Sequence, residues 1–342
     1  MVRPFDWRDL ALLHRMRNTG LCLDSRLAYT RQRYALQNAL LDALTPGRST
    51  YTLIDRPAHL EQEPVFGQVR RRTNQPHARL TFIGPATALV QPNCIQLLDA
   101  LSRSAGEDGA HHLIAEAEET SPVFESLRQA GFAIYARQRI WRLADSLQVN
   151  PILLDAISRK DQPEEHQGGD GPMWRGEMSS DAPAVHSLYL NLVPALVQQV
   201  EPPSIHNGRG LVHWDQGELL GYLFIDRGPQ GVWVHPYFHP AAERLDDLIT
   251  GFLVHHIHHP RKPLYICVRS YQGGLSQSLD RLGFEPFSDQ AVMVKRLAAH
   301  IRQSDRVPLP ALEGSQPEPT APFTPIAVSS QLAQDPPTPE SC

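Results

Sequence analysis

The stretch VWVHPYFHPAAERLDDLI, which begins at Val232, combines residue types that suit the binding of a phosphate group. The apolar run containing Trp233 and Val234 predicts a strand, and residues 241–256 predict the helix that follows it. Main-chain N–H groups at the start of a helix have no acceptor within the helix and lie at the positive end of its dipole. Among the first residues of this helix, Arg244 could attract a phosphate, whereas Glu243 would repel one.

Clusters of histidine, cysteine and arginine elsewhere have simpler interpretations. The run HHIHHP, from His255, lies at the end of a predicted helix, where partly charged histidines complement the helix dipole. Neither carboxylates nor the four widely spaced cysteines accompany it at ligand spacing, so we expect no metal site. The run Arg70–Arg72 is predicted to be a solvated strand end, and the net charge of −5 does not favour a nucleic-acid partner. The sequence contains no GxSxG, GxxxxGK[ST], HExxH or GxGxxG motif, which counts against hydrolases, P-loop NTPases, metalloproteases and dinucleotide-binding enzymes.

Two changes in composition divide the 342 residues. Residues 159–172, RKDQPEEHQGGDGP, have the composition of a linker. Residues 301–342 are largely Pro-rich without hydrophobic periodicity, so we expect a disordered tail, with a proline-motif ligand as the alternative. Two predicted domains remain, 1–158 and 173–300, each long enough for its own core. The N-terminus lacks the apolar core of a signal peptide and no apolar run would span a membrane, so we expect a soluble cytoplasmic protein with no membrane partner.

Both predicted domains alternate strands with helices. In the first, hydrophobic periodicity predicts helices at 7–17, 34–44, 93–104 and 122–130, and strands at 49–55, 65–71, 78–83, 111–117 and 133–143. In the second, it predicts strands at 173–178, 208–214, 218–226, 231–235, 263–269 and 287–297, and helices at 182–192, 241–256 and 274–282. Gly131 follows a predicted helix at the position where a left-handed cap is needed. This order indicates mixed sheets with helices on both faces.

The ends of the two predicted domains align without a gap. LIAEAEETSPVFESLRQAGFAIYARQRIWR, from Leu113, matches YICVRSYQGGLSQSLDRLGFEPFSDQAVMV, from Tyr265, so that Gln138 matches Gln290 and the two Gly-Phe pairs coincide. We interpret this agreement as an internal duplication. Any strand–helix–strand unit with a similar apolar pattern would be the alternative.

At SLRQAGFAIYARQRIWRL and SLDRLGFEPFSDQAVMVKRL the sequence resembles the GNAT superfamily of acyl-CoA-dependent N-acyltransferases. The resemblance covers nearly all of both predicted domains. It implies an α/β (α+β) fold class with two tandem GNAT-like domains, each a mixed, mostly antiparallel sheet flanked by helices. It also implies acetyl-CoA as the acyl donor and a small-molecule or peptide amine as the acceptor. The alternative is a non-catalytic GNAT-like module that binds a ligand or a protein.

The resemblance implies a cofactor site in the second domain. In the family, a splayed strand offers main-chain groups to the pantetheine arm, and a Gly-rich loop at the start of a helix holds the diphosphate. The matching positions are those of the strand, Trp233 and Val234, and those of the loop, His239, Ala241, Ala242, Glu243 and Arg244. The corresponding loop of the first domain has Leu89, Val90 and Pro92 instead of glycines, and a proline offers no N–H. We therefore expect the second domain to be the cofactor-binding one.

The resemblance also implies an acid and a base. Many members have a tyrosine that protonates the departing thiolate, but Leu127 and Leu279 stand at those positions here. Tyr271 would be the substitute acid, with a rim tyrosine as the structural alternative. Glu218, on the predicted hairpin, would be the base that removes the amine proton, with a solvated strand-end charge as its alternative.

Overall fold

The computed structural model describes residues 1–16, 19–31, 50–56, 63–72, 75–143, 174–203, 210–256 and 262–297. These residues belong to one compact unit, Met1–His300. The predicted helix at 34–44, the linker at 159–172 and the tail at 301–342 lie outside the described residues. So do the side chains of the histidine run that begins at His255.

The first half of the described chain follows the predicted order of strands and helices. It opens with β1 (Val2–Pro4), the 3-10 turn Trp7–Asp9 and α1 (Leu10–Met16). Two elements that the sequence did not predict come next, β2 (Leu21–Cys22) and α2 (Ser25–Arg31). The remaining elements are β3 (Thr50–Asp55), β4 (Val65–Arg71), β5 (His77–Gly84), α4 (Pro92–Glu107), β6 (His112–Ala117), α5 (Pro122–Gln129) and β7 (Ala133–Leu143).

The second half repeats this succession. It contains β8 (Arg175–Gly176), α7 (Ala182–Leu192), α8 (Ala195–Val200), β9 (Gly210–Asp215), β10 (Glu218–Arg227), β11 (Val232–Phe238), α9 (Leu245–His256), β12 (Leu264–Arg269), α10 (Leu275–Arg281) and β13 (Glu285–Arg296). Helix α8 was not predicted. Helix α9 begins at Leu245, four residues later than expected, so Ala241–Arg244 form a turn before the helix and not its first turn.

Local sequence explains where several elements end. Proline stands at the first turn of α4 and of α5, where its missing N–H removes no helical hydrogen bond. Gly131 and Gly283 follow α5 and α10 with φ of 86° and 83°, a left-handed conformation that glycine adopts without steric cost. The predicted hairpin between β9 and β10 is also confirmed. Its two turn residues, Gln216 and Gly217, both have positive φ, which matches the right-handed twist of the flanking strands.

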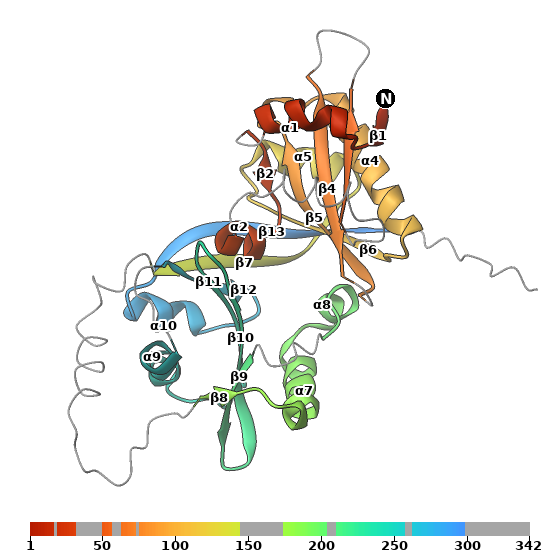
Figure 1. Ribbon diagram of the computed structural model, residues 1–342. Coiled ribbons are helices and arrows are strands. Elements are labelled where there is room, and N and C mark those ends of the chain that lie inside the picture. Colours follow the sequence, from red (N-terminus) through yellow and green to blue (C-terminus); the bar gives the residue numbers. More distant parts are fainter. Residues whose placement is uncertain are drawn as a thin grey trace, which may run out of the picture. The chain divides into compact units, whose positions relative to one another are not determined.

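The strands form one sheet, and the two halves exchange their last strands within it. The order is β1-β3-β4-β5-β6-β13-β7-β12-β11-β10-β9-β8, with β2 beside β5. Strand β13, from the second half, pairs with β6 of the first, and β7, from the first half, pairs with β12 of the second. Figure 1 shows β7 in yellow and β13 in blue running side by side where the halves meet. The main-chain hydrogen bonds of the sheet therefore run without interruption from one half to the other.

The register at this junction agrees with the duplication. Gln138 lies opposite Gln290 in the β7–β13 ladder, so two residues matched by the sequence alignment pair with each other. That pairing is expected where a twofold axis passes between two equivalent antiparallel strands. A second repeated feature lies near the start of each half. Arg3 binds Asp9 through two hydrogen bonds of 2.7 Å, and Arg175 binds Asp181 in the same way.

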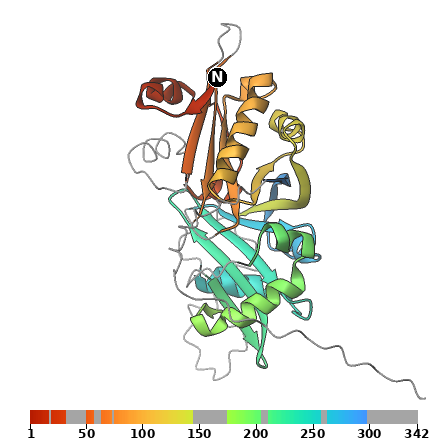
Figure 2. The same ribbon diagram turned by 90° about the vertical axis from the view of Figure 1, so that its right-hand side faces the viewer.

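Helices cover both faces of the sheet. Figure 2 shows α4 lying along the strands of the first half and α7 crossing those of the second. On neighbouring positions of β11, Val234 packs in the core beneath α9 and α10, whereas Trp233 packs on the opposite face with Leu188 of α7. Only the pairs β5–β6 and β11–β12 are parallel among the described strands. The predicted fold class, a mixed and mostly antiparallel sheet flanked by helices, is confirmed.

Candidate cofactor and ligand site

The parallel strands β11 and β12 separate at the position where the sequence predicted a cofactor. They pair over three residues each, ending at Val234 and Ile266. Two residues further along, the side chain of Gln272 lies between the strands. Its amide nitrogen donates to the carbonyl of Pro236 at 2.5 Å, and its oxygen accepts from the N–H of Arg269 at 2.7 Å. A side-chain carboxamide therefore bridges the opening between the two strands.

The parallel pair of the first half is bridged at the corresponding position by the main chain. Strands β5 and β6 pair until Arg79 and Ile114. Beyond them, Leu23 donates its N–H to the carbonyl of Thr81 at 3.0 Å and accepts from the N–H of Glu116 at 2.9 Å. The neighbouring residues Leu21 and Cys22 form β2 against β5. This opening is closed by backbone that no side-chain rotation could move.

The turn between β11 and α9 contains main-chain N–H groups suited to an anion. The N–H of Ala241 bonds Nδ1 of His239 at 3.1 Å, and that of Ala242 bonds the carbonyl of His239 at 2.8 Å. For the four residues that follow, 243–246, the described part of the chain provides no acceptor to the main-chain N–H. Arg244 has a φ of 58°, which is uncommon for a residue with a side chain.

Two carboxylates lie at the start of α9 and would oppose an anion. Each is already paired with an arginine: Asp246 accepts two hydrogen bonds from Arg281, and Asp247 lies 2.5 Å from Nε of Arg244. These exposed pairs reduce the negative charge beside the free N–H groups. Glu243, which was predicted to repel a phosphate, is exposed.

The other predicted site residues have separate locations. Trp233 and Tyr271 line a cavity beside the strand opening, whereas Val234 is buried in the core on the opposite face. Glu218 is exposed at the β9–β10 turn and is not among the residues that line the cavity. The structure thus brings Trp233 and Tyr271 together and leaves the predicted base apart from them.

The cavity has a volume of about 150 Å³ and lies between the two halves. The first half contributes mostly charged residues from α2 and strands β4, β5 and β6. The second half contributes an aromatic wall from α7, β10 and β11, which consists of Tyr189, Tyr222, Phe224, Trp233 and Tyr237. His235 lines the same space, and its Nδ1 lies 3.5 Å from the hydroxyl oxygen of Tyr237. Both halves are required to form this cavity.

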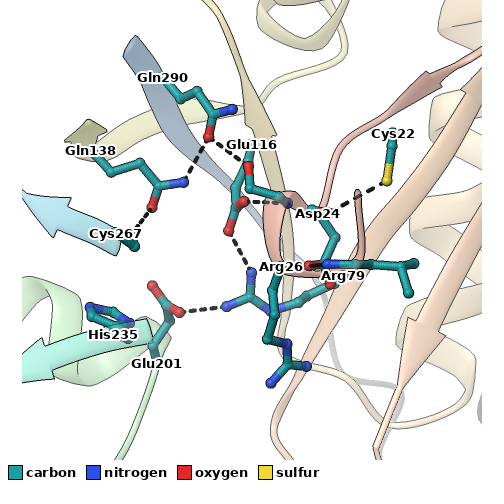
Figure 3. Close-up of polar contacts among 12 residues, drawn as sticks. Cys22, Asp24, Arg26, Arg79, Glu116, Gln138, Glu201, His235, Cys267 and Gln290 are labelled. Atoms are coloured by element: carbon teal, nitrogen blue, oxygen red, sulfur yellow. Dashed lines mark hydrogen bonds and ion pairs between the residues drawn. The ribbon is translucent and has the colours of Figure 1, made fainter. Parts of the chain in front are cut away.

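A network of buried ion pairs joins the halves at the cavity wall (Figure 3). The carboxylate of Glu201, after α8, accepts hydrogen bonds from Arg79 at 2.6 Å, from Arg269 at 2.9 Å and from the hydroxyl of Tyr135 at 2.5 Å. Arg79 also donates to Glu116 at 2.8 Å. Burial alone would raise the pKa of Glu201, but Arg269 and Arg79 outweigh it and hold that pKa far below its ordinary value. Glu201 is therefore a structural anion and a poor proton acceptor.

A second polar chain crosses the junction of the exchanged strands. Gln138 donates to Gln290 at 2.8 Å and accepts from the thiol of Cys267 at 3.3 Å. Gln290 also accepts from the hydroxyl of Ser25 at 2.7 Å. These four residues are buried, each at most 9% exposed. Because a buried polar group must keep its hydrogen-bond partner, these bonds fix the register of β7 against β13.

The arginine run on β4 is not the solvated strand end that the sequence predicted. Arg70 and Arg72 line the cavity. Arg71, between them, donates hydrogen bonds to the carboxylate of Asp108 at 3.2 Å and to the carbonyl of Gln75 at 3.1 Å. Successive residues of a strand face opposite sides of its sheet, so alternate arginines reach the interior. The alternation of residues along a strand could have indicated that Arg70 and Arg72 share one face of the sheet. The sequence did not show that residues of the second half enclose that face.

The described residues contain no group of three or more His, Cys, Asp or Glu side chains that could hold a metal ion. Within the same residues, no helix is both long and apolar enough to cross a membrane.

Comparison with known proteins gives similarity in structure only. No protein-family model and no curated protein matches the sequence. A tandem GNAT protein from the clavulanic acid biosynthesis pathway, solved without AcCoA, is 15% identical, with a TM-score of 0.49 over 86% of this chain and 98% of that one. A GCN5-related N-acetyltransferase from Sphaerobacter thermophilus is 13% identical, with a TM-score of 0.45 over 86% and 95%. A GNAT-family acetyltransferase from Colwellia psychrerythraea is 11% identical, with a TM-score of 0.42 over 87% and 100%.

The chain is thus similar in structure to these proteins.

Proposed function

We propose that the chain is an acyl-CoA-dependent N-acyltransferase whose cofactor site lies in the second half. One arrangement around the end of β11 supports this most directly. The parallel strands β11 and β12 separate, and four main-chain N–H groups without an acceptor among the described residues follow at the start of α9. Such N–H groups bind a diphosphate well. The cavity beside the opening would hold the amine.

Acetyl-CoA fits the residues of the second half on one condition. The N–H groups of residues 243–246 would hold its diphosphate, and Arg244 would add a positive charge. The pantetheine arm contains amide groups, and the carbonyl of Pro236 and the N–H of Arg269 already bind one amide, that of Gln272. The side chain of Gln272 must therefore move out before the arm can enter. The first half offers no comparable place for acetyl-CoA, because the main chain of Leu23 fills the opening between β5 and β6.

Two residues of the cavity would move protons. Bound there, acetyl-CoA would supply an activated acyl group. His235 would accept the proton that the amine loses as its nitrogen bonds to the acyl carbon, and it replaces the distant Glu218 in this role. Burial raises the pKa of Tyr271, so its hydroxyl stays protonated at neutral pH and can protonate the departing sulfur.

The test is a calorimetric titration with acetyl-CoA, followed by an assay of CoA release with a panel of amines. We expect binding by the wild-type chain and a loss of at least about tenfold in affinity for Arg244→Glu, which puts a negative charge beside the N–H groups. Arg128→Glu is the matched control, because Arg128 is also an exposed arginine with a carboxylate three residues away, but on α5. Equal affinities for the two variants would contradict the location of the site.

A non-catalytic ligand-binding module is the second candidate. It is favoured by one observation: an amide bridges the strand opening in both halves. If this candidate is right, no heat is released with millimolar acetyl-CoA, either by the wild-type chain or after removal of the Gln272 side chain.

A further inference from the structure

The arginines at and just after the end of β4, residues 70–72, differ in their electrostatic environment. Arg71 pairs with Asp108, which compensates its charge. For Arg70 and Arg72, the described part of the chain contains no carboxylate within ion-pair distance and no hydrogen-bond acceptor. The negative charge of Asp24, whose buried carboxylate accepts from the N–H of Leu27 at 3.1 Å, acts on both arginines without a direct ion pair. Two half-buried guanidinium groups therefore line the cavity without a direct partner among the described residues.

The positive charges are close enough to affect one another. Burial is the main cause that lowers the pKa of Arg72, to about 10, and the charges of Arg26 and Arg70 lower it further. Arg26 itself is engaged elsewhere, since its Nε lies 3.6 Å from a carboxylate oxygen of Asp226. Arg72 remains charged at neutral pH, so this end of the cavity attracts anions.

Arg269 provides an independent observation in the same cavity. Its side chain is only 4% exposed, and its Nη2 donates to Glu201 at 2.9 Å. Its Nε and Nη1 are buried, and the described residues offer neither of them a hydrogen-bond acceptor. An unsatisfied buried donor is costly, most of all on a charged group, so such donors are commonly met by a ligand. A ligand with acceptor atoms would satisfy them.

The aromatic wall of the second half defines the rest of the ligand. Tyr189, Phe224 and Trp233 of the second half line the same cavity with their aromatic rings. A cavity of about 150 Å³ can hold one ring the size of benzene. An occupant that suited both walls would carry a compact apolar ring and an anionic group.

We infer that the cavity between the halves binds a small aromatic carboxylate or phosphate, with Arg70 and Arg72 of the first half as its anion anchors. Arg269 of the second half completes the anion site. Neither half alone would form this site. The amine acceptor of the proposed function would occupy this same cavity, so it would itself carry the ring and the anionic group. The binding needs no acyl donor, and it applies equally if the chain is not an enzyme.

The experiment uses the full chain and four probes: phenyl phosphate, phenylacetate, the neutral benzyl alcohol, and inorganic phosphate. Each is titrated by calorimetry in the absence of acetyl-CoA. We expect heat from one or both aromatic anions, with the phosphate and the carboxylate arms telling which anion is preferred. Arg70→Gln and Arg72→Gln should each weaken that binding by at least about tenfold, because each removes a charge-assisted contact.

Arg71→Gln is the matched control, since it makes the same change on the same strand at a side chain outside the cavity lining. Its affinity should equal that of the wild-type chain, and thermal unfolding of all three variants would show that they fold. The inference is overturned if no aromatic anion binds at millimolar concentration, or if benzyl alcohol or inorganic phosphate binds as tightly as the aromatic anions. Equal losses for Arg70→Gln and Arg71→Gln would overturn it too.

Discussion

Replacing Gln272 by alanine should raise the affinity of the second half for acetyl-CoA. In the folded chain the Gln272 carboxamide makes two hydrogen bonds, to the carbonyl of Pro236 and from the N–H of Arg269. A hydrogen bond of this kind contributes about 0.5–1.5 kcal/mol, so an entering pantetheine arm must give up about 1–3 kcal/mol to displace it. The alanine variant has no such bonds to break, and its affinity should be higher by a factor of roughly 5 to 150.

Calorimetric titration of both proteins with acetyl-CoA measures this factor directly. Gln272→Met is an informative companion, because methionine fills a similar volume but forms neither hydrogen bond. Its affinity should lie between those of the wild-type chain and the alanine variant. Both variants should lose about 1–3 kcal/mol of stability in urea, since Pro236 and Arg269 keep main-chain groups without partners. An alanine variant that binds acetyl-CoA no more tightly than the wild-type chain would refute the idea that Gln272 occupies the position of the arm.

Three further predictions concern stability. Burial, followed by the charge of Arg79, lowers the pKa of His77 from 6.5 to about 4. The free energy of unfolding should therefore be highest above pH 6.5 and fall by up to about 3 kcal/mol as the pH drops towards 4, because only the unfolded chain takes up the proton there. Urea unfolding at several pH values should show a flatter pH profile for His77→Gln. Glu201→Gln should cost about 3–5 kcal/mol in the same measurement, because Arg79 and Arg269 lose their shared anion, whereas Glu125→Gln on the surface should be nearly neutral. Gly131→Ala and Gly283→Ala should each lower stability by about 1–2 kcal/mol, because both positions have positive φ; a thermal midpoint equal to that of the wild-type chain would contradict this reasoning.

Local patterns predicted the elements of this fold well. Hydrophobic periodicity located strands such as β4 and β7 to the residue, and Gly131 identified the end of α5. The bounds of a strand and the end of a helix depend on residues close together in the chain, so a single sequence is enough to predict them. The duplication was visible for the same reason, and the pairing of Gln138 with Gln290 supports it.

Features that depend on residues distant in sequence were not predicted. Nothing near Leu23 or Gln272 indicates that either would bridge a pair of strands, because each bridge is defined by partners elsewhere in the chain. The position of Arg70 and Arg72 at the cavity was missed, because the aromatic residues that line it with them come from the other half. Sequence reasoning selected Trp233 for the acyl-donor arm and Tyr271 as an acid, and both line the cavity. It could not show that Glu218 would lie at an exposed turn outside the cavity lining.

Because the two halves exchange their last strands, each half needs a strand of the other to complete its part of the sheet. A polypeptide ending after β7 would leave β6 without the neighbour that β13 provides, and would project β7 away from its own half as an uncovered ribbon. The complementary piece, starting near β8, would have the same defect in reverse. Nicking the backbone between residues 143 and 174 would therefore produce two fragments that remain bound as a heterodimer, each completing the hydrogen-bonded edge of the other. Gene truncation at the apparent domain boundary should for that reason give aggregation-prone products, whereas co-expression of the two pieces should restore one folded particle.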